Sequence, residues 1–358
     1  MFDYTERVRR LRGALEQHRL DAFVTTFSPH LRYVSGYSGS NGLCIVTSSA
    51  VFFFTDFRYK EQIESEVECS RSYITTGNLI EKASEEKLLR RCKRVGVEKD
   101  HLPLSQYLEL RKNFSAARFL PTSDIIESFA SVKTEPEIAL IRKAVEITEA
   151  AFRDVLKLLG PGVSELDISA EISYRHKKYG AENDSFEPIV VSGRRGSLPH
   201  GTPSSKKISH GDMVTLDLGC FYRGYCSDLT RTVSVGKPSQ EAKKIYRVVH
   251  EAQQRAIHAA AAGMSAKKLD AVAREYIRSM GYGRYFGHGL GHGIGLRIHE
   301  YPRISSTSTH ALVKGNVVTV EPGIYLPGRC GVRIEDDIVI RNGECEVLTT
   351  LPTTMVVL

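Results

Sequence analysis

The sequence lacks any apolar run long enough to cross a membrane. Its longest run of bulky apolar residues, Val51 to Phe54, falls far short of the roughly 20 residues that a spanning helix needs. The N-terminal segment has no apolar stretch after Arg9 and Arg10, so it does not read as a secretory signal. The seven cysteines form no CxxC pair, which favours reduced thiols over a disulfide framework. We therefore expect a cytoplasmic protein with no membrane partner.

The chain also lacks a large excess of positive or negative charge. The net charge is +7 over 358 residues. The two arginine-rich clusters, at 7–12 and 90–94, fall on expected amphipathic helices, whose charged faces contact solvent. This pattern argues against a nucleic-acid partner. The apolar fraction of 41% and the charged fraction of 25% are those of a globular protein, and the length allows two domains.

The first part of the chain alternates helix-like and strand-like segments. Helices are expected at 4–17, from about residue 59, at 79–91 and at 104–113, and strands at 22–26, 43–47, 51–55 and 95–98. This alternation predicts an α/β N-terminal domain over residues 1–128, in which helices cover a small mixed sheet.

A long helix opens the second part, which we expect to span residues 129–358. Thr134 and Glu137 form a capping-box pattern, with Pro136 in the first turn. One apolar face of the helix follows, formed by Ile138, Ile141, Val145 and Phe152.

The second part contains a faint internal repeat. An offset of 104 matches Gly211 to Gly315, Thr215 to Thr319, Asp217 to Glu321, Gly219 to Gly323 and Gly224 to Gly328. An offset of 101 matches Gly162 to Gly263, Ser164 to Ser265 and Gly180 to Gly281. Two copies of a helix-helix-hairpin unit, packed around a pseudo-twofold axis, would place a site between them. The repeat thus predicts an α+β C-terminal domain.

Residues 286–300, FGHGLGHGIGLRIHE, carry a glycine at every second position from 287 to 295. Because glycine is a poor helix former, we expect an extended segment with the glycines on one face and His288 and His292 on the other. His299 reaches that side only if the strand bends or bulges. The run lacks a GxGxxG register, and Pro302 excludes an HExxH helix. A glycine-rich loop with incidental histidines is the alternative.

Each repeated hairpin carries acids where a core strand should have none. They are Asp217 and Asp228 in the first hairpin, and Glu321, Glu335 and Asp336 in the second. Buried carboxylates require cations, and the nearby basic residues are Arg231 and Arg333. Four carboxylates with one or two imidazoles predict an oxygen-rich site for two divalent ions. Surface hairpin acids are the alternative.

Four segments, LDLGCFYRGYCSDLTRT, HGLGHGIGLRIHE, VTVEPGIY and VRIEDD, together resemble the proline-specific metallopeptidases of the pita-bread fold. Within that family the chain looks most like the bacterial Xaa-Pro aminopeptidases. In the first part, SGYSGSNG and TDFRY resemble the creatinase/prolidase-type N-terminal domain that accompanies these enzymes. The resemblance therefore implies a pita-bread catalytic domain after an α/β domain.

The resemblance also implies the site residues. The metal ligands fall on Asp217, Asp228, His292, Glu321 and Glu335. Asp228 and Glu335 would bridge two divalent ions, for which manganese is favoured and cobalt or zinc are alternatives. The substrate-side residues fall on His288, His299, His200 and Arg333.

Catalytic roles follow from this assignment. Glu321 would move a proton, His299 would stabilise the tetrahedral oxyanion, and His288 would hold the substrate backbone. Arg194 and Arg195 stand where small or amide side chains are expected, and no role is assigned to them.

The implied activity is hydrolysis of the bond before proline, which releases the N-terminal residue from peptides with proline second. An Xaa-Pro dipeptidase (prolidase) is the first alternative, because both enzymes cut the same bond. An inactive binding module and a metal-free creatinase-type hydrolase would lack the acid set that this chain keeps. A methionyl aminopeptidase would lack the N-terminal domain. The N-terminal resemblance favours the aminopeptidase, and we expect a homodimer.

Overall fold

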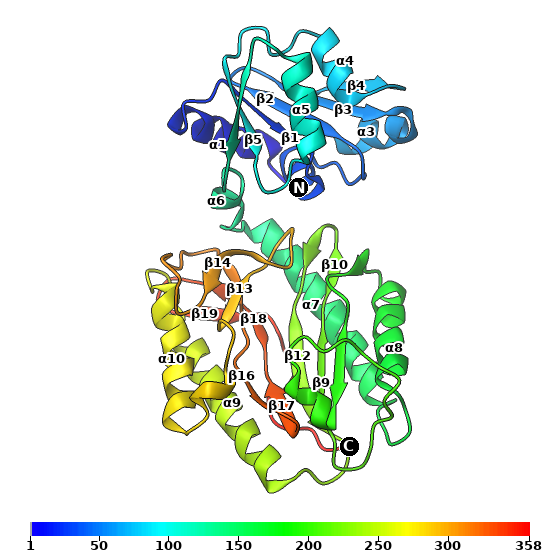
Figure 1. The fold of residues 1–358 in the computed structure, drawn as a ribbon, viewed down its shortest axis with the longest axis vertical. Coiled ribbons are helices and arrows are strands. Elements are labelled where there is room, and N and C mark those ends of the chain that lie inside the picture. The colour runs from blue at the N-terminus through cyan, green and yellow to red at the C-terminus, as the bar shows by residue number, and fades with distance from the viewer. Residues whose placement is uncertain (1) are drawn as a thin grey trace. The chain divides into compact units, whose positions relative to one another are not determined.

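The computed structural model describes residues 2–358. The chain divides into two compact units, Met1–Ala130 and Ser131–Leu358 (Figure 1). Each unit is described by itself. Within residues 2–358, no helix has the length and apolar character that a membrane span requires.

The first unit is a mixed sheet with helices packed against it. Its helices are α1 (Tyr4–Gln17), α2 (Ser28–Ser35), α3 (Lys60–Glu66), α4 (Leu79–Glu85), α5 (Leu104–Asn113) and α6 (Glu127–Ala130), with a 3-10 turn η1 (Phe57–Tyr59). Its strands are β1 (Ala22–Thr25), β2 (Leu43–Thr47), β3 (Val51–Asp56), β4 (Arg71–Thr75), β5 (Arg94–Glu98) and β6 (Arg118–Thr122). The sheet order is β4-β3-β2-β1-β5-β6. Pairs β1–β2 and β2–β3 are antiparallel, and the others are parallel.

The predicted α/β pattern is present, and its misses have physical reasons. The sequence did not indicate β4 and β6, which are the two edge strands of the sheet and have largely exposed or half-buried side chains. Such strands carry little apolar signal. Helix α4 ends at Glu85, before the expected residue 91, and Lys87 then adopts a left-handed φ of 55°.

The second unit contains two similar sets of helices and strands. Its helices are α7 (Glu135–Leu156), α8 (Glu165–Lys178), α9 (Gln240–Ala259) and α10 (Ala266–Ser279), with 3-10 turns η2 (Gly193–Ser197) and η3 (Gly283–Tyr285). The strands of the first set are β7 (Asn183–Asp184), β8 (Ile189–Ser192), β9 (Met213–Leu218), β10 (Cys220–Tyr222), β11 (Tyr225–Cys226) and β12 (Leu229–Ser234). Those of the second set are β13 (Gly291–Gly293), β14 (Glu300–Ile304), β15 (Val317–Val320), β16 (Gly323–Leu326), β17 (Cys330–Arg333), β18 (Asp336–Ile340) and β19 (Cys345–Val347).

The internal repeat is visible in backbone geometry. Ser164 and Ser265 are the N-caps of α8 and α10, which have 14 residues each. The matched glycines Gly162 and Gly263 have φ values of 92° and 88°. Such left-handed φ angles favour glycine. The predicted duplication of a helix-helix-hairpin unit is therefore present in the structure.

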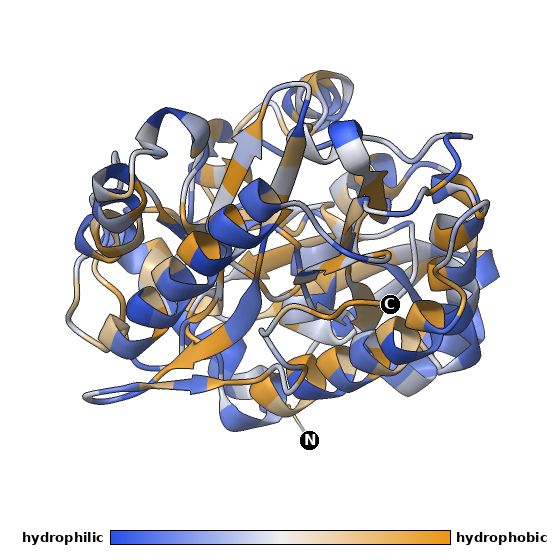
Figure 2. Ribbon diagram, turned by 90° about the horizontal axis from the view of Figure 1, so that it is seen from below, coloured by the Kyte–Doolittle hydropathy of each residue, from blue (hydrophilic) through white to orange (hydrophobic). Residues whose placement is uncertain are grey.

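Each helix pair packs on the strands of its own repeat. Apolar residues of α7 and α8 form a core with β9 and β12, and those of α9 and α10 form a core with β15 and β18. Figure 1 shows α8 and α10 on opposite sides of these strands. Figure 2 shows hydrophilic and hydrophobic residues alternating along the helices, as expected for helices that bury one face.

The long helix α7 begins as its sequence predicts. The Glu137 side chain accepts hydrogen bonds from the backbone N–H and the hydroxyl of Thr134, at 2.7 and 2.8 Å. The predicted apolar face, formed by Ile138, Ile141, Val145 and Phe152, is buried. The capping box therefore fixes the start of α7 at the beginning of the second unit.

The glycine-rich segment is extended over a shorter stretch than predicted. Only Gly291–Gly293 forms a strand, β13, and its pairing with β14 shifts register between these two glycines. The bare face packs against backbone: a Cβ added at Gly291 would lie 2.1 Å from the carbonyl oxygen of Thr319, and one at Gly293 would lie 2.1 Å from that of Tyr301. The alternating glycines therefore allow neighbouring strands to approach closely.

We predict that Gly291→Ala destabilises the protein. The added methyl group would meet backbone that cannot yield, and overpacking of this kind costs about 1–3 kcal/mol or more. Gly287→Ala is the matched control, because nothing lies within 4 Å of a Cβ at that position. Its effect should stay within about 0.5 kcal/mol. Urea unfolding measures both variants, and equal losses of stability would contradict the packing argument.

Candidate metal centre

A pocket of about 280 Å³ lies in the second unit. The five predicted metal ligands all line it, together with His200, His299 and Arg333. Apolar side chains that include Phe186, Ile189 and Ile298 also contribute to the wall. His288, which we expected to contact substrate, is not among the lining residues.

The ends of the repeated hairpins bring the acids to this pocket. Asp217 lies near the end of β9, opposite Thr230 of β12, and Asp228 immediately precedes β12. In the second repeat, Glu321 immediately follows β15, and Glu335 lies between β17 and β18. Each repeat therefore contributes one acid at or just after the end of one strand, and a second acid just before a later strand.

Hydrogen bonds between the two hairpins fix the acids in place. The Thr230 hydroxyl donates to Glu335 Oε2 at 2.6 Å, and the Glu335 N–H donates to the Thr230 carbonyl at 3.1 Å. The backbone N–H of Asp228 donates to Oδ2 of Asp337 at 2.9 Å. The two repeats thus face each other across the site, as the duplication implied.

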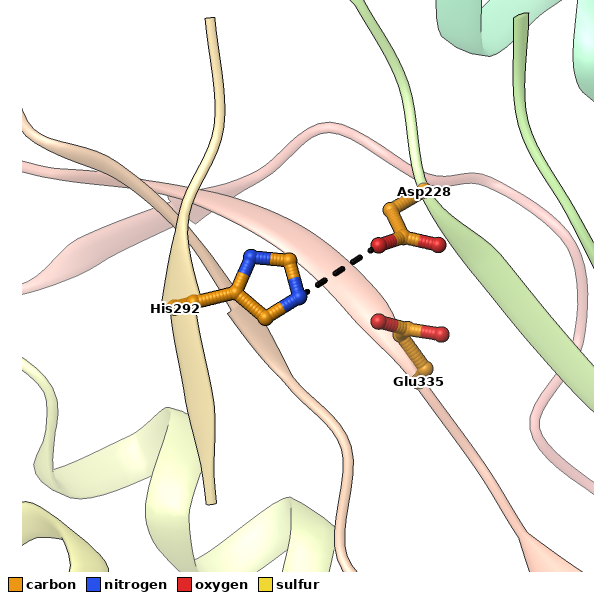
Figure 3. A group of neighbouring side chains, drawn as sticks. All are labelled: Asp228, His292 and Glu335. Carbon is orange, nitrogen blue, oxygen red and sulfur yellow. Dashed lines mark ion pairs between the residues drawn. The ribbon is translucent and has the colours of Figure 1, made fainter. Parts of the chain in front are cut away.

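Asp228, His292 and Glu335 form the tightest cluster of ligand-type atoms (Figure 3). One atom from each lies within 4.8 Å of the other two. His292 Nε2 is 3.6 Å from Asp228 Oδ2 and 3.5 Å from Glu321 Oε1. Because the other ring nitrogen, Nδ1, faces the carbonyl of Gly293 at 3.2 Å, Nδ1 carries the proton and Nε2 presents a lone pair. This is the tautomer that a metal ligand requires.

Burial strongly affects the protonation of these groups. Loss of water raises the pKa of Asp228 and of Glu335 well above the usual range, and the neighbouring carboxylates raise both further. Burial likewise raises the pKa of Glu321 to about 8 and lowers the pKa of His292 to about 3. Several groups with lone pairs therefore line one pocket, where a cation would stabilise all of them.

Arg333 is the one guanidinium that lines the pocket within the described chain, and it is already engaged. Its NH2 group pairs with Asp217 Oδ2 at 2.5 Å. The other oxygen of that carboxylate, Oδ1, is buried and has no hydrogen-bond partner among residues 2–358. An orphaned carboxylate oxygen in a pocket that His292 also lines fits a site for divalent cations, since oxygen and imidazole ligands suit manganese, iron, cobalt or zinc.

The second arginine supports the scaffold. Arg231 NH2 pairs with Asp336 Oδ1 at 2.7 Å, and its NH1 donates to the carbonyl of Glu335. Gln253 and Thr349 also donate to Asp336. Asp336 is therefore satisfied by protein groups, whereas its neighbour Glu335 lines the pocket. Each arginine pairs with an acid of the opposite repeat, which sequence proximity did not indicate.

The three histidines that we expected to face substrate occupy different environments. His299 and His200 are exposed at the pocket, and the ring of His299 lies 4.4 Å from that of His292. The bulge that the sequence required is present in β13. His288 is instead half-buried, with Nδ1 2.8 Å from the carbonyl of Gly289 and Nε2 2.9 Å from the hydroxyl of Tyr325. Both of its nitrogens are occupied.

Arg195 holds the loop that carries His200. It donates to the fully buried Glu165 at 2.9 Å and to the carbonyl of Thr202 at 2.5 Å. Glu165 also accepts from the backbone and hydroxyl groups of Ser192 and Ser204. Arg195 is absent from the pocket lining. Nothing in the structure explains the choice of arginine at Arg194.

Some residues around the site were missed by the sequence analysis. Tyr325 lies within the quoted VTVEPGIY segment, yet its hydroxyl joins His288 to Arg333. Thr230 and Asp337 hold the acids. An isolated polar residue forms no sequence pattern. Only the pairing of the two hairpins shows that these side chains hold the acids.

Family models match both units of the chain. The model of metallopeptidase family M24 matches residues 139–342, and the model of the creatinase/prolidase N-terminal domain matches residues 7–131. These matches confirm the resemblance that the motifs indicated.

Similar proteins cover nearly the whole chain. An Xaa-Pro dipeptidase from Bacillus anthracis is 41% identical, with a TM-score of 0.97 over 99% of this chain and 100% of that one. An X-Pro aminopeptidase from Thermotoga maritima MSB8 is 38% identical, with a TM-score of 0.91 over 97% and 100%. An Xaa-Pro dipeptidase of Pyrococcus horikoshii is 37% identical over 96% of this chain and 97% of its own length. The predicted fold, an α/β domain followed by a pita-bread domain, is therefore confirmed.

We predict that Glu335→Ala loses its divalent metal. Protein dialysed with excess Mn²⁺ should carry about two ions per chain by elemental analysis, and removal of a bridging carboxylate should release both. Glu187→Ala is the matched control, because Glu187 is an exposed carboxylate of the same pocket outside the ligand set. It should keep its metal. A wild-type protein that binds none after loading would refute the ligand assignment.

Proposed function

We propose that this chain, which belongs to metallopeptidase family M24, hydrolyses Xaa-Pro dipeptides. The observation that carries the proposal is the end-to-end likeness to proteins named Xaa-Pro dipeptidases. This likeness favours the dipeptidase alternative over the aminopeptidase that the N-terminal motifs suggested. The two activities cut the same bond, so the predicted fold and ligand set are unaffected.

The charge around His299 supports a dipeptide substrate. Burial lowers the pKa of His299, and the positive charges of Arg303, His200 and Arg297 lower it further. Arg303 is exposed, and its side chain makes no hydrogen bond or ion pair with residues 2–358. A dipeptide places the free carboxylate of its proline close to the scissile bond, and an unpaired guanidinium suits a carboxylate well. We assign that contact to Arg303.

The pocket wall suits a proline ring. Phe186, Ile189 and Ile298 supply apolar surface beside the five ligands, so a pyrrolidine ring can be buried without loss of a hydrogen bond. In an Xaa-Pro bond the proline nitrogen belongs to a tertiary amide and carries no hydrogen, so it needs no hydrogen-bond acceptor in the pocket. Apolar contact at that position therefore favours proline over residues that bring an amide donor.

Asp217, Asp228, His292, Glu321 and Glu335 would hold two divalent cations. When bound there, such cations supply a water that ionises near neutral pH and polarise the scissile carbonyl. Glu321 is placed to move a proton, because its side chain lines the pocket together with the other predicted ligands. His299 is kept neutral by its surroundings and can donate one N–H to a developing oxyanion.

The role of His288 differs from our expectation. Because both ring nitrogens are occupied by Gly289 and Tyr325, we assign it to orienting Tyr325 and not to holding the substrate. Manganese as the native metal, two ions per chain and a homodimer stay predictions.

We predict that kcat/KM is higher for Ala-Pro than for Ala-Pro-Ala under the same metal. The free carboxylate of a dipeptide can pair with Arg303, whereas a tripeptide places a neutral amide at that position. Replacement of proline by alanine in the dipeptide should abolish cleavage. A clear preference for the tripeptide would support the aminopeptidase alternative and would leave the proposed metal centre unchanged.

We also predict that Arg303→Ala raises the KM for Ala-Pro by about tenfold or more, which corresponds to the loss of one charged hydrogen-bond partner. Arg303→Lys should recover part of the affinity, since it retains the charge without the guanidinium fork. Hydrolysis of Ala-Pro-amide, which has no carboxylate, should change little in either variant. If Arg303→Ala weakens both substrates equally, Arg303 does not recognise the carboxylate.

A further inference from the structure

We infer that the ion pair between the buried Asp270 and the partly exposed Arg274 on α10 positions the catalytic pocket through His288. The inference rests on the proposed function, because it assigns residues to that same site. Neither residue lines the pocket, and neither belongs to a motif that the sequence analysis singled out. They act as positioning residues, since they touch no reacting atom.

The pair has the geometry of a strong, oriented interaction. Asp270 is fully buried. Arg274 Nε donates to its Oδ2 and Arg274 NH2 donates to its Oδ1, each at 2.7 Å. The guanidinium also lies 4.3 Å from the centre of the Phe286 ring. A bidentate pair fixes the plane of the guanidinium, and with it the directions of the remaining N–H groups.

Those remaining groups hold the histidine segment by its backbone. Arg274 NH1 donates to the carbonyl of Phe286 at 3.0 Å, and NH2 donates to the carbonyl of His288 at 2.6 Å. Asp270 Oδ1 accepts from the N–H of Leu290 at 3.1 Å. This stretch contains Gly287 and Gly289 and is not part of a strand. The pair therefore supplies the fixed geometry that regular structure does not.

A chain of hydrogen bonds leads from His288 to the metal ligands. His288 Nδ1 faces the Gly289 carbonyl and must donate, so Nε2 of the neutral ring accepts from the Tyr325 hydroxyl at 2.9 Å. The Tyr325 oxygen accepts from Arg333 NH1, also at 2.9 Å. Arg333 NH2 pairs with Asp217. Displacement of His288 would thus displace the arginine that orients a ligand carboxylate.

A second connection passes through the backbone. The Leu290 carbonyl accepts from the N–H of Glu321 at 2.8 Å. Asp270 holds Leu290 by its N–H, so the same residue links α10 to the proposed proton carrier. The first repeat uses a comparable arrangement, in which the buried Glu165 on α8 and Arg195 hold the loop of His200.

The first test measures His288 directly and needs neither metal nor activity. Selective ¹⁵N labelling of histidine in the metal-free protein, with His288→Gln for assignment, reports the tautomer of His288. The wild type should show the proton on Nδ1. Arg274→Lys, which keeps the charge but loses the fork, should shift or broaden the His288 signals.

The matched control is Arg255→Lys on α9. Arg255 pairs with Glu251 at 2.7 Å with the same i,i+4 spacing, but both side chains are about half exposed, at 52% and 45%. This variant should leave the His288 signals unchanged. If Arg274→Lys also leaves them unchanged, the proposal is overturned, whatever the enzyme hydrolyses.

The second test asks whether the effect reaches the reaction through Tyr325. With Ala-Pro and saturating metal, Arg274→Lys should lower kcat by about tenfold, since small misplacements of catalytic groups are costly. In a Tyr325→Phe background the same change should cost less than about twofold, because residues that act through one chain are not additive. Additive effects would overturn the proposal. A wild type that cleaves no Xaa-Pro dipeptide would refute the proposed function, and the tautomer measurement would still decide the positioning role.

Discussion

Repulsion between buried carboxylates is the constraint on which the catalytic unit depends. Asp217, Asp228 and Glu335 are each less than 10% exposed, and Glu321 is raised in pKa by burial and by Asp217. One guanidinium, on Arg333, cannot neutralise four acids. The fold tolerates this arrangement because Thr230 and the backbone of the facing hairpin hold Glu335. A cation bound there would stabilise the unit, since it would remove the repulsion that folding creates.

Duplication explains why the acids meet at all. A single hairpin could not surround a cation, whereas two copies that face each other contribute acids from opposite sides. The copies have since diverged in use. Arg333 crosses to Asp217 inside the pocket, while Arg231 crosses to Asp336 outside it. The same type of ion pair therefore orients a ligand in one place and joins the two repeats in the other.

Much of the fold and of the candidate site could be predicted from the sequence, and the parts that could not have physical reasons. The acids, His292 and the capped helix α7 were predictable because repeated spacing, glycine alternation and capping residues are local patterns. The side chains of Tyr325, Thr230 and Asp337 were not, because their importance lies in contacts with residues far along the chain. The contacts of His288 were not indicated by the sequence either. Its position in the motif suggested a substrate contact, but Tyr325 and a backbone carbonyl occupy its ring.

Substrate length is the property that the chemistry of the proposed metal centre leaves open. The predicted ligands and His299 would act on the scissile bond and its carbonyl, which are the same in a dipeptide and in a longer peptide. Discrimination must come from the place where the chain of a longer peptide would continue. Under the proposed function, Arg303 would lie there; it is exposed and belongs to no strong motif. An exposed arginine can be substituted without disturbing the core. Enzymes that share the same metal centre can therefore differ in the length of peptide that they accept.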